Sequence, residues 1–270
     1  MATPDITAGA ASATDTRRLV TWGLFFAGIL VAWVLLAIMS AAVEDGPGSG
    51  SLTGYIADLC LTAAGELRFS GLLAMWALMA LAMMAPTAVP FFRTFDDFRH
   101  ARPEAVTPVH LAVLMVGFGL VWLTFAVFAA AGQMLLWRAS LVDLSGQSTS
   151  LVLTGALLAA AGLYQWTPLK EACLTACRAP LAFFLQHWRP GTDGALAMGA
   201  RHGLDCLGCC IALMALAFVG GAMNIYWMAL ATLLMALEKL PAIGRPITTP
   251  LGIALLAAAF LTFGRASGLL

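Results

Sequence analysis

The sequence is poor in charged residues, which make up 10% of its 270 residues, whereas soluble domains typically have about a quarter. This scarcity excludes an ordinary soluble domain. Positive and negative charges balance and no block of like charge occurs, which excludes nucleic acid as an expected partner. The sequence also lacks a P-loop and a DKTG-like aspartyl-phosphate motif, so any transport would be passive or ion-coupled.

The alternating apolar–polar pattern of β-barrel strands is absent as well. Instead the chain is 61% hydrophobic with a mean hydropathy of +0.90, and Leu, Ala and Met dominate its long apolar runs. Such runs reach the roughly 20 residues that a helix needs to cross a bilayer. We therefore predict an all-α fold, a polytopic transmembrane helical bundle that forms one domain over residues 19–270 after a disordered tail over 1–18.

Seven spans are predicted, with ends uncertain by a few residues. The first, over 19–43, exceeds the 7–15 residues of a secretory apolar segment, so we expect it to be retained. The fifth and sixth are joined by the short GGAMN sequence at 220–224 and could instead form one broken helix. The predicted spans are 19–43, 70–92, 108–137, 151–178, 200–220, 222–240 and 248–265.

The distribution of Lys and Arg predicts a cytoplasmic N-terminus, because these residues concentrate on the cytoplasmic side of membrane proteins. With seven spans, eleven basic residues lie inside and three outside. Merging the fifth and sixth spans would change this to nine against five. The asymmetry favours seven spans and a cytoplasmic N-terminus.

Five of the six cysteines occur in two groups, ACLTACRAP at 172–180 and DCLGCC at 205–210. The predicted topology places both groups at the cytoplasmic ends of consecutive antiparallel spans, where thiols stay reduced and a structural disulfide is not expected. Cys60 lies alone, on the outside, and is expected only to pack.

Helical spacing puts each group on one face of its helix, because residues three and four apart are neighbours. One face carries Trp166, Lys170, Cys173 and Cys177, and the other carries His202, Cys206, Cys209, Cys210 and Met214. Facing sulfurs favour a soft metal such as Cu(I), Zn(II) or an iron–sulfur cluster. The predicted ligands are Cys173, Cys177, Cys206, Cys209 and Cys210, with His202, Met214 and Met83 as additional candidates; simple packing of the cysteines is the alternative.

The thirteen methionines tilt the choice of metal towards Cu(I), since a thioether is a soft ligand, although most are expected to fill the core. Asn224 and Glu238 share one face of the predicted sixth span. Intramembrane polar groups usually face the bundle interior. An inward Glu238 is therefore favoured, in an ion pair with Lys170, where it could orient a ligand or balance metal charge. The alternative is that both side chains extend into the lipid headgroup region.

Three strings resemble the DUF2182 family of predicted metal-binding integral membrane proteins of bacteria. They are YQWTPLKEACLTACRAPL at 164–181, the segment over 203–239 that begins GLDCLGCC, and MWALMALAMMAPTAVP at 75–90. The resemblance implies a location in the bacterial inner membrane and a metal site built from the five clustered cysteines. It also draws Gln165, Lys170, Asn224 and Glu238 into the site, around the ligands.

The leading hypothesis is Cu(I) handling, as delivery, transport or assembly of a copper enzyme, with the bilayer and a copper-donor or copper-acceptor protein as partners. The main alternative is a thiol redox protein linked to quinone or haem, because CLGC at 206–209 is a CxxC at a predicted helix start. A closed structural Zn(II) site and a protein without metal are further alternatives. No catalytic residues are identified, and a non-enzymatic role is favoured.

Overall fold

The structure is a computed structural model that describes residues 6–45, 62–63, 66–101 and 107–268. Over these ranges the chain is almost entirely helical, which confirms the predicted all-α class. Two strands of two residues each, β1 (Thr62–Ala63) and β2 (Glu66–Leu67), pair antiparallel. Cys60 lies outside the described residues, so the prediction that it only packs stays a prediction.

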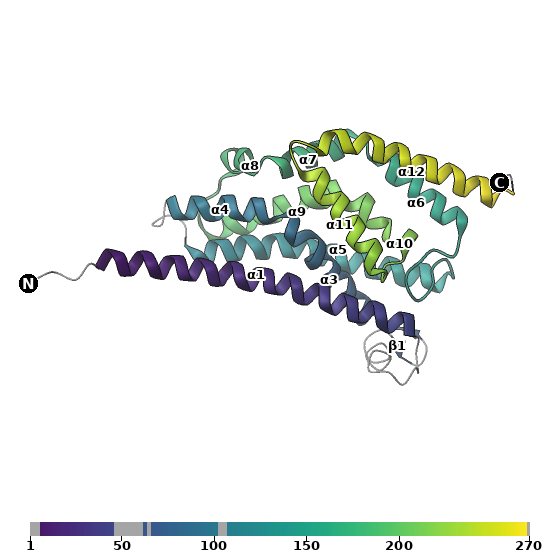
Figure 1. The fold of residues 1–270 in the computed structure, drawn as a ribbon, viewed down its shortest axis with the longest axis horizontal. Coiled ribbons are helices and arrows are strands. Elements are labelled where there is room, and N and C mark those ends of the chain that lie inside the picture. Colours follow the sequence, from purple (N-terminus) through teal and green to yellow (C-terminus); the bar gives the residue numbers. More distant parts are fainter. Residues whose placement is uncertain (1–5, 46–61, 64–65, 102–106, 269–270) are drawn as a thin grey trace, which may run out of the picture.

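Figure 1 shows how the helices are arranged. They are α1 (Ile6–Asp45), α3 (Phe69–Thr87), α4 (Val89–Ala101), α5 (Pro108–Arg138), α6 (Leu151–Tyr164), α7 (Pro168–Arg178), α8 (Pro180–His187), α9 (Gly191–Ala215), α10 (Ala217–Gly220), α11 (Ile225–Lys239) and α12 (Gly244–Ala266).

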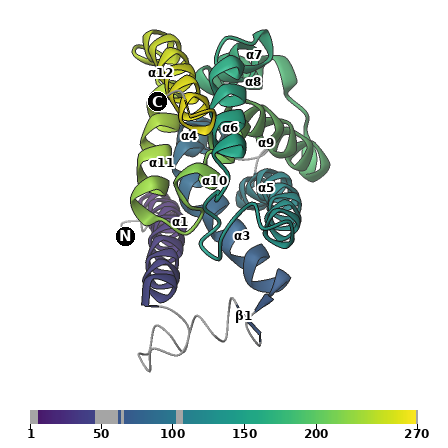
Figure 2. The same ribbon diagram turned by 90° about the vertical axis from the view of Figure 1, so that its right-hand side faces the viewer.

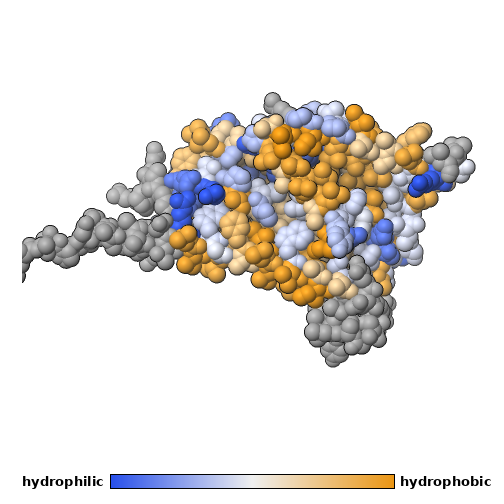
Figure 3. All heavy atoms as spheres, viewed as in Figure 1, coloured by the Kyte–Doolittle hydropathy of each residue, from blue (hydrophilic) through white to orange (hydrophobic). Residues whose placement is uncertain are grey.

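In the part of the chain that the structure describes, five helical segments are long and apolar enough to cross a membrane, as in a multi-pass membrane protein. These are Arg18–Ala41, Phe69–Thr87, Val109–Arg138, Gly191–Gly220 and Pro246–Ala266, and Leu151–Tyr164 is a shorter apolar helix. Figure 3 shows apolar residues over much of the visible face, with the largest hydrophilic groups towards the two ends of its long axis. Seven spans and a cytoplasmic N-terminus stay predictions.

The predicted continuous helix over 151–178 is wrong, because the chain forms two helices, α6 and α7, with a break at residues 165–167. Pro168 explains the break: proline has no backbone N–H to donate and disfavours a helical conformation in the residue before it. Thr167 then caps α7, its side chain accepting a hydrogen bond from the Lys170 backbone N–H.

Three other boundaries also differ from the predicted ones. The helix predicted to begin at residue 200 begins at Gly191, and the one predicted to run to residue 92 ends at Thr87, just after Pro86. Helix α1 begins at Ile6 and so includes residues 6–18, which were expected to be a disordered tail. This segment is rich in Ala, the residue with the highest intrinsic helix propensity.

Two long pairs organise the bundle: α5 packs along α9, and α6 packs along α12, with α3 between α5 and α1 (Figure 2). Glycine allows the α5–α9 approach, since a Cβ on Gly199 would lie 2.0 Å from the Leu114 carbonyl oxygen and one on Gly117 2.3 Å from that of Leu196. Helix α9 is therefore held firmly along one side, and α7 packs against it.

Candidate metal centre

Cysteines of α7 and α9 come into direct contact. The Cys177 Sγ lies 3.9 Å from the Cys209 Sγ, and the Cys209 Sγ lies 3.3 Å from that of Cys210. Cys206 adjoins them, since its backbone carbonyl accepts a 3.1 Å hydrogen bond from the Cys209 Sγ. Cys177 is half-buried and the three cysteines of α9 are fully buried. We call these four residues the sulfur cluster.

Cys173 is placed differently from the other four predicted ligands. It is buried on α7, and its Sγ would lie only 2.5 Å from a Cβ added to Gly208. The absence of a side chain at Gly208 therefore lets α7 approach α9 at this point. The Tyr164 hydroxyl, at the end of α6, donates a 2.6 Å hydrogen bond to the Gly208 carbonyl and fixes the same contact. Cys173 helps to seat α7 beside the sulfur cluster.

Lys239, the last residue of α11, reaches the sulfur cluster. Its Nζ lies 3.1 Å from the Cys206 Sγ and 2.7 Å from the Thr87 Oγ1, and the side chain is buried. Among the described residues no carboxylate forms an ion pair with this ammonium group. A buried cation is costly unless an anion or strong acceptors face it. The sulfur cluster is thus the negative counterpart that the surroundings of Lys239 offer.

The predicted ion pair between Lys170 and Glu238 is present and completely buried. The Lys170 Nζ lies 2.8 Å from both carboxylate oxygens of Glu238, and it also donates to the Gln165 side-chain oxygen. Arg178 adds two hydrogen bonds to the Glu238 carbonyl, at 2.9 and 2.7 Å. This network joins the start of α7 to the end of α11, one residue before Lys239.

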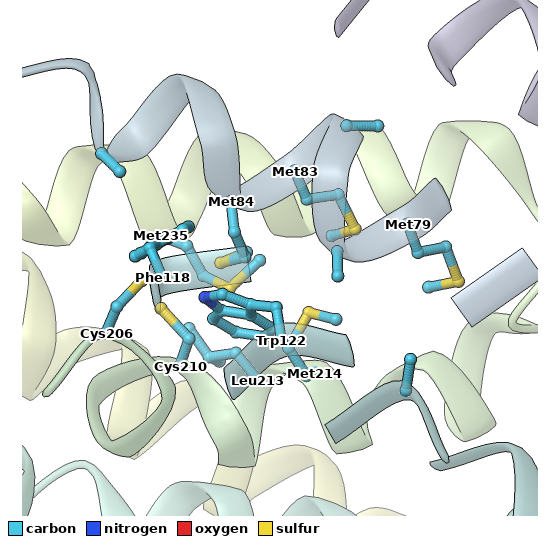
Figure 4. Packing of buried hydrophobic residues seen from close by; sticks show 14 of the residues in the cluster. Met79, Met83, Met84, Phe118, Trp122, Cys206, Cys210, Leu213, Met214 and Met235 are labelled. Carbon is cyan, nitrogen blue, oxygen red and sulfur yellow. The ribbon is translucent and has the colours of Figure 1, made fainter. Parts of the chain in front are cut away.

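The additional candidate ligands His202, Met214 and Met83 are buried in the same bundle, and no hydrogen bond joins them to the sulfur cluster among the described residues. His202 is buried one turn before Cys206, and its ring stacks on Phe91 with centroids 3.7 Å apart. Met214 is buried one turn after Cys210. Met83 belongs to the same apolar core, but in Figure 4 it lies well to one side of Cys206 and Cys210, whereas Met84 and Met235 point into the region beside them.

Asn224 is not brought to the sulfur cluster. It caps the opposite end of α11, where its side-chain oxygen accepts hydrogen bonds from the backbone N–H groups of Tyr226 and Trp227, both at 3.1 Å. A helix of 15 residues is about 22 Å long. Asn224 therefore lies far from the candidate cysteine ligands with which the resemblance had grouped it. In the structure it caps α11.

Among the described residues, no group of three or more His, Cys, Asp or Glu side chains is already arranged around a metal position. The donor chemistry of the sulfur cluster nevertheless suits a soft ion. Two sulfurs bound to one metal at about 2.3 Å in a tetrahedral site lie about 3.8 Å apart. The 3.9 Å between the Cys177 and Cys209 sulfurs is close to this spacing.

Sequence reasoning missed Lys239, Gly208 and Tyr164. Lys239 follows Glu238 directly. A second charged residue at the end of an apolar helix indicates a candidate site residue, so the sequence did mark Lys239. Gly208 lies inside the CLGC string, where a helical glycine indicates a close approach. Nothing in the sequence marks Tyr164, whose partner is a backbone carbonyl 44 residues away.

In a comparison with protein families, residues 73–262 fit a family model described as PpoB2, copper chaperone. A search of curated proteins finds no match. Solved structures also give no match. The matched segment contains every residue of the sulfur cluster together with Lys239. It supports the copper-related character that the thiols and methionines predicted, and it carries a different family name from the one that the resemblance suggested. Because the match covers well over half of the chain, this protein belongs to the PpoB2 copper chaperone family.

Proposed function

We propose that this protein binds Cu(I) through the sulfur cluster in the membrane and passes it to a partner copper protein. The observation that carries the proposal is the contact between Cys177 and Cys209, which joins two helices at the spacing of shared metal ligands. Copper handling is what the family suggests. The oxidation state, the ligands and the bacterial inner membrane as location are our inference, the last from the resemblance and the basic residues.

The charge of the site favours a monovalent ion. A Cu(I) ion held by two thiolates carries one net negative charge, which the Lys239 ammonium 3.1 Å from Cys206 would balance. Zn(II) held by the same two thiolates would be neutral and would leave the buried Lys239 ammonium without a negative counterpart. Since buried charge is tolerated only when it is compensated, the Cu(I) complex fits this environment better.

The surroundings also favour a soft ion over a hard one. The carboxylate of Glu238, next to Lys239 in the chain, is already paired with Lys170. The apolar core around Cys206 and Cys210 is rich in methionine (Figure 4). Thiolate and thioether sulfurs select Cu(I), whereas oxygen ligands select hard cations. The Cys residues also stay reduced if this end of α7 faces the cytoplasm, as the basic residues predict.

Movement of copper across the membrane is a second candidate function. Met84, Met83 and Met79 are all buried on α3 and extend away from Cys206 and Cys210 along the core in Figure 4. Thioethers bind Cu(I) more weakly than thiolates do, and weak sites in series suit release. Delivery to a partner requires the sulfur cluster alone, whereas transport requires these methionines as well.

The test is the copper content of full-length protein purified anaerobically in detergent, measured by mass spectrometry before and after Cu(I) loading. We expect tight, roughly stoichiometric Cu(I) in the wild type. A Cys177→Ala/Cys209→Ala variant should bind at least about 100-fold more weakly, because each ligand of a sulfur site contributes several kcal/mol. Cys60→Ala is the matched control and should bind as the wild type does.

The same measurement identifies the alternatives. Zinc retained in place of copper would indicate a structural site and contradict the proposal. Copper bound equally well by the double variant would exclude the sulfur cluster as the site. No metal, together with a thiol pair that cycles with quinone, would replace copper handling by redox chemistry. A Met79→Leu/Met83→Leu variant that binds copper normally but fails to move it in vesicles would favour transport over delivery.

A further inference from the structure

A small basic cavity lies away from the sulfur cluster, between the end of α8 and the first half of α9. Its volume is about 180 Å³. It is lined by His187, Arg189, Ala197, Met198 and Arg201. We call this the basic cavity. Three of its five lining residues carry nitrogen donors, and the other two are apolar, so its chemistry suits a compact anion.

The chain that forms the basic cavity is held in place by aromatic packing. The Trp188 ring lies 6.0 Å from that of Phe95 and 5.9 Å from that of Phe98, between centroids, which ties the connection between α8 and α9 to α4. The His187 ring stacks on Phe183 at 4.9 Å, and its Nδ1 lies 3.2 Å from the Phe183 carbonyl oxygen. This leaves the Nε2 of His187 to face a ligand.

The two arginines keep most of their donors available. Arg201 is 60% exposed at its side chain, and its Nε lies 3.9 Å from a carboxylate oxygen of Asp205, too far for a hydrogen bond. Arg189 is also exposed and forms no ion pair among the described residues. Asp205 is thus the one carboxylate that competes with an incoming anion at Arg201. Paired guanidinium groups are well suited to the oxygens of a phosphate group.

The position of the basic cavity favours a lipid as the source of that phosphate group. Helix α9 carries its charged residues, Asp193, Arg201 and Asp205, before Cys206 and none after it, so the membrane boundary is expected along this N-terminal part. Leu181 and Leu185 of α8 are 55% and 73% exposed, and Trp188 is partly exposed beside them. Exposed Leu and Trp next to Arg is the pattern of a membrane interface.

We propose that the basic cavity binds a phosphate group, and that the headgroup of an anionic phospholipid supplies it. The phosphate oxygens would accept hydrogen bonds from Arg189, Arg201 and His187, while the acyl chains lie against the exposed leucines of α8. Basic pockets at this level of a helical membrane protein are recognised binding places for anionic lipid headgroups. The proposal does not depend on copper binding.

The experiment measures binding of phosphatidylglycerol to delipidated full-length protein in neutral detergent, by titration and by the shift in thermal unfolding temperature. Phosphatidylcholine and inorganic phosphate are titrated in parallel. The variant is Arg189→Gln/Arg201→Gln, and the control is Arg265→Gln, an exposed arginine in the last turn of α12. Circular dichroism and copper loading of each variant report on folding separately.

We expect phosphatidylglycerol to bind more tightly than phosphatidylcholine and to raise the unfolding temperature of the wild type. Each basic residue near an anionic lipid contributes about a factor of five in affinity, so the double variant should bind about 30-fold more weakly. Arg265→Gln should bind as the wild type does. Equal binding of the two lipids, or wild-type affinity in the folded double variant, would overturn the proposal. Stabilisation by inorganic phosphate with none by phosphatidylglycerol would overturn the headgroup as the source.

Discussion

Two buried lysines lie close to the same end of α11 and have opposite surroundings. Lys170 contacts both carboxylate oxygens of Glu238 at 2.8 Å, so its charge is matched within the protein. Lys239, the residue next to Glu238, contacts Thr87 and the sulfur of Cys206, and no carboxylate among the described residues pairs with it. The two ammonium groups are both buried and belong to adjoining networks. Only the ammonium of Lys170 is paired with a carboxylate among the described residues.

This difference separates a structural role from a functional one. A buried pair with matched charges holds its helices in register and has nothing left to offer a ligand. An ammonium group that faces thiols can stabilise a negatively charged complex that those thiols form with a metal ion. Lys170 and Glu238 therefore belong to the architecture of the site, whereas under the proposed function Lys239 would balance the charge of bound Cu(I).

The largest effect is expected from Lys170→Met. It leaves the Glu238 carboxylate buried without its partner, which typically costs about 3–5 kcal/mol of the free energy of unfolding. Denaturant unfolding in mixed micelles, followed by circular dichroism, would measure the change. Lys170→Met/Glu238→Leu is the control, since removing both charges should restore most of the loss. Wild-type stability in Lys170→Met would show that the pair is not a structural element.

A smaller effect of a different kind is expected from Lys239→Met. Loss of a group that supports metal ligands typically lowers affinity by about 10–100-fold, and competition with a Cu(I) chelator would measure it. The free energy of unfolding should change by less than about 1 kcal/mol, because removing this ammonium leaves no partner carboxylate behind. In Lys239→Met, the Thr87 hydroxyl would still donate its hydrogen bond to the Met84 carbonyl, so it would not be left without a partner.

Lys239→Arg provides the matched control for that prediction, since it retains the positive charge. Its Cu(I) affinity should stay within a few fold of the wild type. If Lys239→Met binds Cu(I) normally, the contrast between the two lysines has no functional meaning. If Lys239→Met instead unfolds as easily as Lys170→Met, both networks are structural.

The smallest effect is expected at the far end of α11, from Asn224→Ala. Loss of the two hydrogen bonds that its side chain accepts from Tyr226 and Trp227 should cost about 1 kcal/mol of the free energy of unfolding, the usual value for a helix N-cap. Cu(I) affinity should not change, because the cap is a helix length from Lys239. Asn224→Ser retains a cap and serves as the control. If Asn224→Ala binds copper more weakly but is as stable as the wild type, Asn224 contributes to the metal site after all.

Much of the site was predictable because its elements follow from periodicity within single helices. Spacings of three and four residues put Cys206, Cys209 and Cys210 close together on α9 and Cys173 with Cys177 on α7. The cost of buried charge paired Lys170 with Glu238 correctly. The break before α7 was missed although Pro168 and the polar residues around it, Gln165, Thr167 and Lys170, marked the place.

Other features depend on how distant helices rotate against each other, which periodicity does not specify. Cys173 meets Gly208 instead of another sulfur because α7 is seated there by the missing side chain and by Tyr164. Asn224 and Glu238 share a face of α11 but lie at its two ends, so only one of them reaches the site. Lys239 reaches Cys206 because α11 packs against both α3 and α9.

The sequence by itself determined the helical fold, the apolar segments long enough for a membrane and the concentration of sulfur on two successive helices. These properties follow from composition and from the 3.6-residue repeat, which act locally. Only the tertiary structure decided which sulfurs touch, which lysine is left to face them and where Asn224 lies. Those outcomes depend on contacts between residues far apart in the chain, where one glycine or one rotated helix changes the partner.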